Sequence, residues 1–244
     1  MRKPTAFFLL LTLCVGLARA GTAPLKVVML SGAWEYQSEQ SLRAFKGYLE
    51  KHYRASCTLL QARKRDDLPG LEALDDCDVM LLFTRRLSLK GDQLERFKRY
   101  CLAGRPIAAV RTASHAIQTW LELDGEVLGG HYHGHYGGGA IQTVEIHPEA
   151  KGHPVLKGVE PLKSTYSLYK TGPLAKDAAL LMTSSTPKAT APEPAAWTRG
   201  HKGGRVFYTS LGGPKDFQNP AFRQMLVNAL FWTAKREVEG RPEP

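Results

Sequence analysis

The stretch DVMLLFTRRLSLKGDQLERFKRYCLAGRPIAAVRTASHA, residues 78–116, decides the fold. Near its start, residues 78–83 contain an apolar run, and near its end, residues 106–111 contain a second one. Between them Leu94, Phe97 and Leu102 recur at helical spacing, and Gly104 closes the segment. Such short apolar runs predict strands that are buried on both faces. A strand, a helix and a strand in this order predict parallel neighbours in one sheet.

The same alternation extends outward from this stretch. Before it, strands over residues 25–30 and 56–60 flank a predicted helix over residues 38–53. After it, residues 112–115 are expected to turn into another helix that carries Ile117, Trp120 and Leu121. The sequence therefore predicts an α/β fold of three layers, with a mainly parallel central sheet and helices on both faces.

The second half of the chain is less regular. Strands are expected over residues 141–146 and 179–182, and residues 195–198 and 206–211 are the arms of a predicted hairpin. Asn219-Pro220 then opens a final helix in the preferred order of cap and proline. We expect one domain over residues 21–236 and a disordered tail over residues 237–244.

The first twenty residues have the pattern of an export signal. A basic start is followed by an apolar stretch, residues 7–17, and by Ala18-Arg19-Ala20, which fits cleavage after Ala20. The alternative is an uncleaved membrane anchor, for which the apolar stretch is short. No later segment is apolar enough to cross a membrane. We therefore expect export of the mature chain to the periplasm or the extracellular space.

Composition excludes some classes of partner. Removal of Arg2, Lys3 and Arg19 with the signal lowers the formal charge from +10 to +7. The remaining cations are scattered, without an arginine-rich arm or a basic motif interleaved with aromatic residues, so nucleic-acid binding is not indicated. The mature chain keeps Cys57, Cys77 and Cys101. An odd, low count in or beside predicted core elements favours buried thiols over a disulfide framework. No pattern indicates an oligomeric state.

The turn after the predicted strand at residues 106–111 carries the first candidate catalytic residues, Arg111, Ser114 and His115. In parallel sheets, ligands bind beyond the carboxyl ends of the strands. One interpretation is that Arg111 orients an anionic or hydroxyl-rich group while His115 acts as acid or base. The alternative is that Ser114 caps a helix and His115 is solvated in its first turn. A serine hydrolase is not supported, because no G-x-S-x-G elbow is present.

The loop GGHYHGHYGGG, residues 129–139, carries His131, His133 and His135. In extended backbone, residues two apart point to the same side, so the three imidazoles can converge on a divalent transition metal such as zinc. The alternative is a loop without metal, in which the imidazoles together with Tyr132 and Tyr136 hold a sugar or another polar ligand. Both interpretations remain open. A carboxylate ligand, if a metal needs one, comes from Glu126, Glu35 or Asp216.

Other candidate ligand-binding residues follow strands that end at the same edge. Trp34, Glu35 and Tyr36 combine an aromatic platform with a carboxylate, although Trp34 also fits a packed helix entry. Arg85 follows the predicted strand over residues 78–83, and its side chain either binds an anion or is simply solvated. Asp216, after the final predicted strand, is either a base or a turn residue.

Four segments together resemble the ThuA-like family, named for a trehalose-utilisation protein. They are residues 78–116, quoted above, EVLGGHYHGHYGGG (126–139), HPVLKGVEPLKSTYSLYK (153–170) and GGRVFYTSLGGPKDFQNPAFRQMLVNALFW (203–232). The resemblance implies a flavodoxin-like fold of the class I glutamine amidotransferase type and an association with carbohydrates, including oxidised (keto) sugars. Two departures stand out: Arg111 occupies a position where other members have a histidine, and Gly212-Gly213 stands in place of a Gly-His pair.

The turn also lacks the cysteine that amidotransferases carry there, so a thioester glutaminase mechanism is not expected. Two hypotheses remain. The first is an exported protein that acts on a carbohydrate or keto-sugar at the carboxyl edge of the sheet, by hydrolysis, isomerisation or elimination. The second is a binding module that holds such a ligand on an amidotransferase-like scaffold without catalysis.

Overall fold

The computed structural model of the protein describes residues 23–138 and 140–241. The predicted export signal, residues 1–20, lies outside the described residues. Nine strands form one sheet in the order β2-β1-β3-β4-β9-β8-β7-β5-β6. The strands are β1 (Leu25–Gly32), β2 (Ala55–Gln61), β3 (Val79–Thr84), β4 (Ile107–Val110), β5 (Gln142–Ile146), β6 (Leu162–Ser164), β7 (Ala179–Ser185), β8 (Glu193–His201) and β9 (Gly204–Thr209).

The sheet is mixed, so the prediction of a mainly parallel sheet is wrong. Strands β2, β1, β3, β4 and β9 are parallel neighbours, whereas β9, β8, β7, β5 and β6 pair in antiparallel fashion. The change of direction begins at the tight turn Lys202-Gly203, in which both residues have positive φ, 46° and 83°. A two-residue turn of this kind joins only antiparallel strands. The predicted hairpin is thereby confirmed, with a longer first arm, β8, and a second arm, β9, that begins two residues earlier than the sequence indicated.

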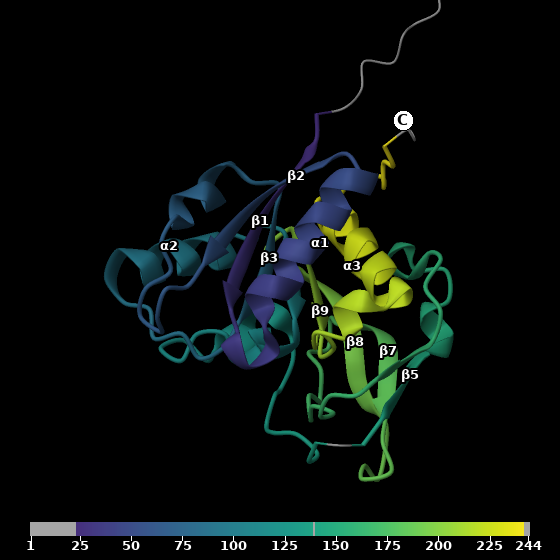
Figure 1. Ribbon diagram of the computed structural model, residues 1–244. Coiled ribbons are helices and arrows are strands. Elements are labelled where there is room, and N and C mark those ends of the chain that lie inside the picture. Colours follow the sequence, from purple (N-terminus) through teal and green to yellow (C-terminus); the bar gives the residue numbers. More distant parts are fainter. Residues whose placement is uncertain (1–22, 139, 242–244) are drawn as a thin grey trace, which may run out of the picture.

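Three layers result from the alternation of side chains along the parallel strands. Val27, Met29 and Leu81 face a core that α1 (Ser38–His52) and α3 (Pro220–Thr233) cover. Val28 and Leu82 face the opposite core, which α2 (Gly91–Leu102) covers. Figure 1 shows α1 and α3 side by side on one face of the sheet and α2 beyond its other face. Alternate residues of one buried strand thus serve two cores, which is why these strands read as continuous apolar runs.

The helix expected after residues 112–115 does not form as one element. The chain makes a 3-10 helix at Arg111–His115 and a π-helical turn at Asp124–Leu128. Between them it runs beside the segment that follows β3, where Ile117 forms a parallel bridge with Leu87 and the Gln118 amide donates to the Leu87 carbonyl at 2.7 Å. Because this partner takes the backbone groups, a regular helix cannot use them.

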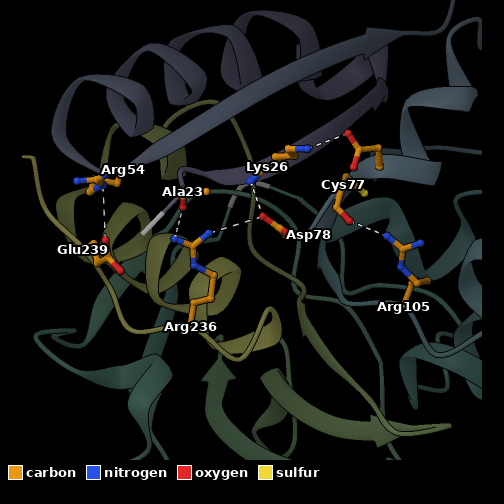
Figure 2. Close-up of polar contacts among 9 residues, drawn as sticks. Ala23, Lys26, Arg54, Cys77, Asp78, Arg105, Arg236 and Glu239 are labelled. Atoms are coloured by element: carbon orange, nitrogen blue, oxygen red, sulfur yellow. Dashed lines mark hydrogen bonds and ion pairs between the residues drawn. The ribbon is translucent and has the colours of Figure 1, made fainter. Parts of the chain in front are cut away.

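Polar contacts at the amino-terminal edge of the sheet bind the chain end to β1 and β2 (Figure 2). Arg236 donates to the carbonyl of Ala23 at 2.6 Å and lies 3.7 Å from the Asp78 carboxylate. The Arg54 amide donates to the Glu239 carbonyl at 2.9 Å. The described part of the expected disordered tail, residues 237–241, is therefore hydrogen-bonded beside β2, which differs from the prediction.

The three cysteines agree with the expected state, because Cys57, Cys77 and Cys101 are buried free thiols. Burial raises the pKa of all three thiols, which keeps them protonated at neutral pH. Of the helices in residues 23–138 and 140–241, none is long and apolar enough to span a membrane.

Candidate functional site

The candidate site lies at the carboxyl ends of β1, β3 and β4. Arg111 follows β4 directly and has a left-handed backbone, with φ at 48°. This conformation is uncommon for a residue with a side chain and marks a sharp strand-to-helix turn. The Tyr208 hydroxyl donates to the Arg111 carbonyl at 2.6 Å and so helps to hold the turn. The sharp turn expected from the sequence is present.

The Arg111 side chain is fully buried and faces protein groups. Its guanidinium donates to the carbonyl of Ser210 at 2.9 Å and to the carbonyl and hydroxyl of Ser167 at 3.2 and 3.1 Å. Three rings surround it in what we call the tyrosine cage, with guanidinium-to-centroid distances of 4.6, 5.4 and 4.5 Å to Tyr36, Tyr166 and Tyr169.

Cation–π contact stabilises this charge in place of a carboxylate, since Arg111 forms no salt bridge within the described part of the chain. Arg111 therefore links β4, β9 and the 166–169 segment, and its guanidinium does not point at the adjoining cavity.

His115 occupies the end of the same turn and does face that cavity. Its ring stacks on Tyr132 with centroids 4.5 Å apart and planes 22° apart, and Nδ1 shares a 3.0 Å hydrogen bond with the Ser114 hydroxyl. Burial, reinforced by the nearby charges of Arg86 and Arg85, lowers the pKa of His115 to about 3. The imidazole is therefore neutral at physiological pH, and it offers hydrogen bonds rather than a positive charge.

Asp124 is a candidate that the sequence reasoning missed. Its Oδ2 accepts the Tyr132 amide at 2.7 Å, and its Oδ1 is buried without a hydrogen-bond partner among the described residues. Burial raises the pKa of Asp124 to about 6, against an ordinary value of 3.8. The Asp-Gly pair at 124–125 looks like simple turn chemistry in the sequence, so only the fold shows that this carboxyl is buried in the wall of a cavity that His115 also lines.

The histidine loop is extended, as the metal interpretation requires. Its amides and carbonyls pair with residues 168–171, for example His131 with Thr171 and Gly134 with Lys170, each at 2.9 Å. The three imidazoles are exposed, whereas Tyr132 and Tyr136 are half-buried. This pairing fixes the loop against the body of the protein and places alternate side chains on opposite sides.

The described residues do not form the predicted metal-ligand set. The rings of His131 and His133 lie 5.4 Å apart between centroids, but Nδ1 of His133 donates to the His131 carbonyl and Nδ1 of His135 donates to the Tyr136 carbonyl. Within residues 23–138 and 140–241, no three histidine, cysteine or acidic side chains are arranged to hold a metal ion.

A cavity of about 590 Å³ collects these groups, and its size suits a small polar ligand. The turn after β4, the π-helical turn and the histidine loop each contribute to its wall. The lining residues with functional side chains are Arg86, Ser114, His115, Asp124, His131, Tyr132, His133 and His135. The structure thus brings together two of the three predicted catalytic residues, Tyr132 and all three loop histidines.

The remaining predicted residues lie near this edge but outside the cavity wall. Glu35 and Arg85 form an ion pair at 2.7 Å beside Trp34, whose side chain is 46% exposed. Tyr36 belongs to the tyrosine cage. The Tyr136 hydroxyl donates to Glu193 at 3.1 Å.

Asp216 has a structural position in the turn after β9. Its buried Oδ2 accepts the amides of Gly212 and Gly213, each at 2.9 Å. The structure also explains why residue 213 in this turn is a glycine.

A Cβ on Gly213 would lie 1.8 Å from the Tyr166 ring, so Tyr166 fills the space that a larger residue would need. Arg111 lies against the same ring. Arg111 and Gly213 therefore both lie against Tyr166.

Fold and site define an α/β protein with a mixed sheet, in which a buried arginine, Arg111, occupies the turn after β4. The family model for ThuA, described as trehalose utilisation, matches residues 26–233, and the chain belongs to this family. A comparison with curated proteins gave no significant match.

Solved structures agree with this assignment at the level of the fold. A ThuA-like protein from Bacteroides uniformis ATCC 8492 has a TM-score of 0.67 and 20% identity, over 89% of this chain and 94% of the other. A ThuA-like protein from Parabacteroides merdae ATCC 43184 has a TM-score of 0.67 and 18% identity, over 88% and 91%. A glutamine amidotransferase from Thermotoga maritima is more distant, with a TM-score of 0.51 and 12% identity over 84% and 96%.

Proposed function

We propose that this protein binds a carbohydrate or keto-sugar in the cavity between the turn after β4 and the histidine loop, and that Asp124 transfers protons there. One observation carries the proposal: Asp124 and His115 line a single cavity, and burial disfavours the charged form of both. Titratable groups with perturbed pKa values in one concave site are typical of functional sites. The family's association with trehalose utilisation supports a sugar as the ligand.

The cavity wall suits a sugar in its chemistry. Tyr132 and His115 present stacked rings, and sugars pack their C–H faces on rings of this kind, while the loop imidazoles offer hydrogen bonds to hydroxyl groups. Because His115 is neutral above pH 4, it can accept or donate a hydrogen bond without the desolvation that an imidazolium would require.

Asp124 is better suited than His115 to act as acid or base. A group transfers protons best when its pKa lies near the working pH, and Asp124, with a pKa of about 6, meets this condition, whereas His115 does not. This reverses the role first given to His115 from the sequence. Asp124 would take a proton from a ligand hydroxyl or carbon and return it, as isomerisation or elimination of a keto-sugar requires.

The second candidate function is a binding module without turnover. The observation in its favour is Arg111, which occupies the turn after β4, where the chain has no cysteine, and is itself enclosed by the tyrosine cage. Both candidates place the ligand in the same cavity. They differ in whether Asp124→Asn abolishes a reaction or changes only affinity.

The test is calorimetric titration of the mature protein with trehalose and with its keto derivative. We expect binding that Tyr132→Ala weakens at least tenfold, because this change removes the ring stacked on His115. Tyr48→Ala, on α1, is the matched control and leaves affinity unchanged. Equal effects of both variants, or unaltered affinity in Tyr132→Ala, would place the ligand elsewhere. Product analysis after prolonged incubation then separates the enzyme from the binding module.

Export belongs to the same proposal. The basic and apolar pattern of residues 1–20 supports a cleaved leader, so the protein would meet its sugar in the periplasm or outside the cell. Mass spectrometry of the protein recovered from a periplasmic fraction tests this. Export with cleavage predicts a mature amino terminus at Gly21, whereas an intact chain in the membrane fraction supports the anchor alternative.

A further inference from the structure

A second cavity, of about 720 Å³, lies at the opposite edge of the sheet. Arg205, at the start of β9, and Trp232, near the end of α3, contribute to its wall, as do the turn that carries Lys157 and the segment after α3. The candidate sugar site lies at the other end of the parallel strands. A strand of six residues, such as β9, spans about 17–20 Å, so the two cavities are separate.

The charges around this second cavity are strongly unequal. Lys157, Arg205, Lys235 and Arg236 line it, and Glu237 is the one carboxylate among its lining residues. Arg236 is engaged with Asp78 and the Ala23 carbonyl, as Figure 2 shows. Within the described residues the other three cations form no ion pair with a carboxylate. They therefore leave a local excess of positive charge on a concave surface.

The Arg205 side chain and the backbone of the turn that carries Lys157 are held in place before any ligand arrives. Arg205 donates to the Trp232 carbonyl at 2.9 Å and stacks on the Trp232 ring, with its guanidinium 4.7 Å from the centroid. The side chain of Asn228 donates to the carbonyls of Val155 and Lys157, at 3.0 and 2.8 Å, which fixes the Lys157 turn against α3. Fixed donors lose little conformational entropy when they bind a ligand.

Helix capping alone does not account for this arrangement. Cations are favourable near the carboxyl end of a helix, and Arg205 fulfils this role at Trp232. Lys235, however, donates to the Gly203 carbonyl in the β8–β9 turn, and Lys157 comes from a separate turn before β6. Cations from three segments thus lie around one cavity. This is a larger number of positive charges than capping of the carboxyl end of α3 requires.

We propose that this cavity binds a small polyanion, a compound with clustered carboxylate or phosphate oxygens. The Arg205 guanidinium has further N–H donors in a fixed plane that suit paired oxygens, and the two lysines supply point charges around it. A ligand of this kind fits the volume and the charge, and its binding falls as salt rises because Lys157 and Lys235 are exposed. This site is independent of the sugar cavity.

Calorimetric titration of the mature protein with inorganic phosphate and with citrate, in buffer of low ionic strength, tests the proposal. Saturable binding of either anion is expected. The anion that binds more tightly shows whether the site prefers phosphate or carboxylate oxygens. Lys157→Ala should weaken that binding at least fivefold, while Lys163→Ala, which removes the exposed side chain of the edge strand β6, leaves it unchanged. Because Lys157 is exposed, its removal leaves the fold intact, which a melting curve checks. No saturable binding of either anion, or equal loss in both variants, overturns the proposal.

Discussion

The amide of Tyr132 donates a 2.7 Å hydrogen bond to the carboxyl of Asp124, and Tyr132 in turn stacks its ring on His115. A single residue of the histidine loop thus contacts both titratable groups of the candidate site. The loop position and the ionisation of Asp124 are coupled through this bond, because the ionised carboxylate is the stronger acceptor.

The stability of the protein should depend on Asp124 between pH 4 and pH 6. Its pKa is raised from 3.8 to about 6 in the folded state, so the folded protein holds this proton more tightly than the unfolded chain does. The resulting stabilisation is complete below pH 4, is lost as pH rises to about 6, and amounts to roughly 3 kcal/mol. Because His115 titrates with the opposite sign over the same range, the Asp124 contribution is the difference between variants: urea unfolding at several pH values should show stability rising more steeply from pH 4 to pH 6 in Asp124→Asn than in the native protein. Asp75→Asn, an exposed control, should keep the native slope.

His115 should contribute the opposite slope. Its pKa falls from 6.5 to about 3 in the folded state, so the unfolded chain binds the proton more tightly, and stability is lost as pH falls from 6.5 towards 3. His115→Gln should remove this loss, as measured by unfolding at pH 7 and pH 5. An unchanged difference between these two pH values in the variant would show that His115 is not the buried neutral group described here.

Arg111→Met should destabilise the fold by about 2–4 kcal/mol. The variant keeps an apolar stem of similar length but leaves the carbonyls of Ser210 and Ser167 without their donors and removes the charge from the tyrosine cage. Thermal unfolding measures the loss. Arg85→Met, in the partly exposed pair with Glu35, is the control and should change stability by less than about 1 kcal/mol. Similar losses would mean that the cage adds no stability.

Gly213→Ala should be destabilising because its Cβ would lie 1.8 Å from the Tyr166 ring. Removal of the ring in the double variant Gly213→Ala/Tyr166→Ala should recover part of the loss, with a coupling of about 1–3 kcal/mol in a double-mutant cycle. Gly200→Ala, with open space around its Cβ, is the control. Additive effects of the two substitutions would show that another contact excludes the side chain.

Much of the parallel half of the fold follows from the sequence, because buried strands such as β3 and the periodic helix after it carry strong local signals. The antiparallel β8–β9 pair follows from the predicted hairpin, whereas the antiparallel addition of β7, β5 and β6 does not, since long-range pairing sets the direction of these strands. The site was predicted in part: His115 and the loop histidines were expected at one edge.

Asp124 and the enclosure of Arg111 were not predicted. Burial is a property of the assembled tertiary structure, and no local pattern in the sequence distinguishes a buried Asp-Gly turn from an exposed one. The same holds for Arg111, whose charge is stabilised by cation–π contacts with Tyr36, Tyr166 and Tyr169, from segments remote in the sequence.

The most direct test of the account is a carbon-13 NMR titration of the Asp124 carboxyl, assigned by comparison with Asp124→Asn, in the free protein and with a bound sugar. The account predicts a pKa near 6 in the free protein and a shift of that pKa when the sugar fills the cavity. A carboxyl that titrates near 3.8 and does not respond to a sugar that binds the protein would contradict both the proton-transfer role of Asp124 and the proposed location of the ligand.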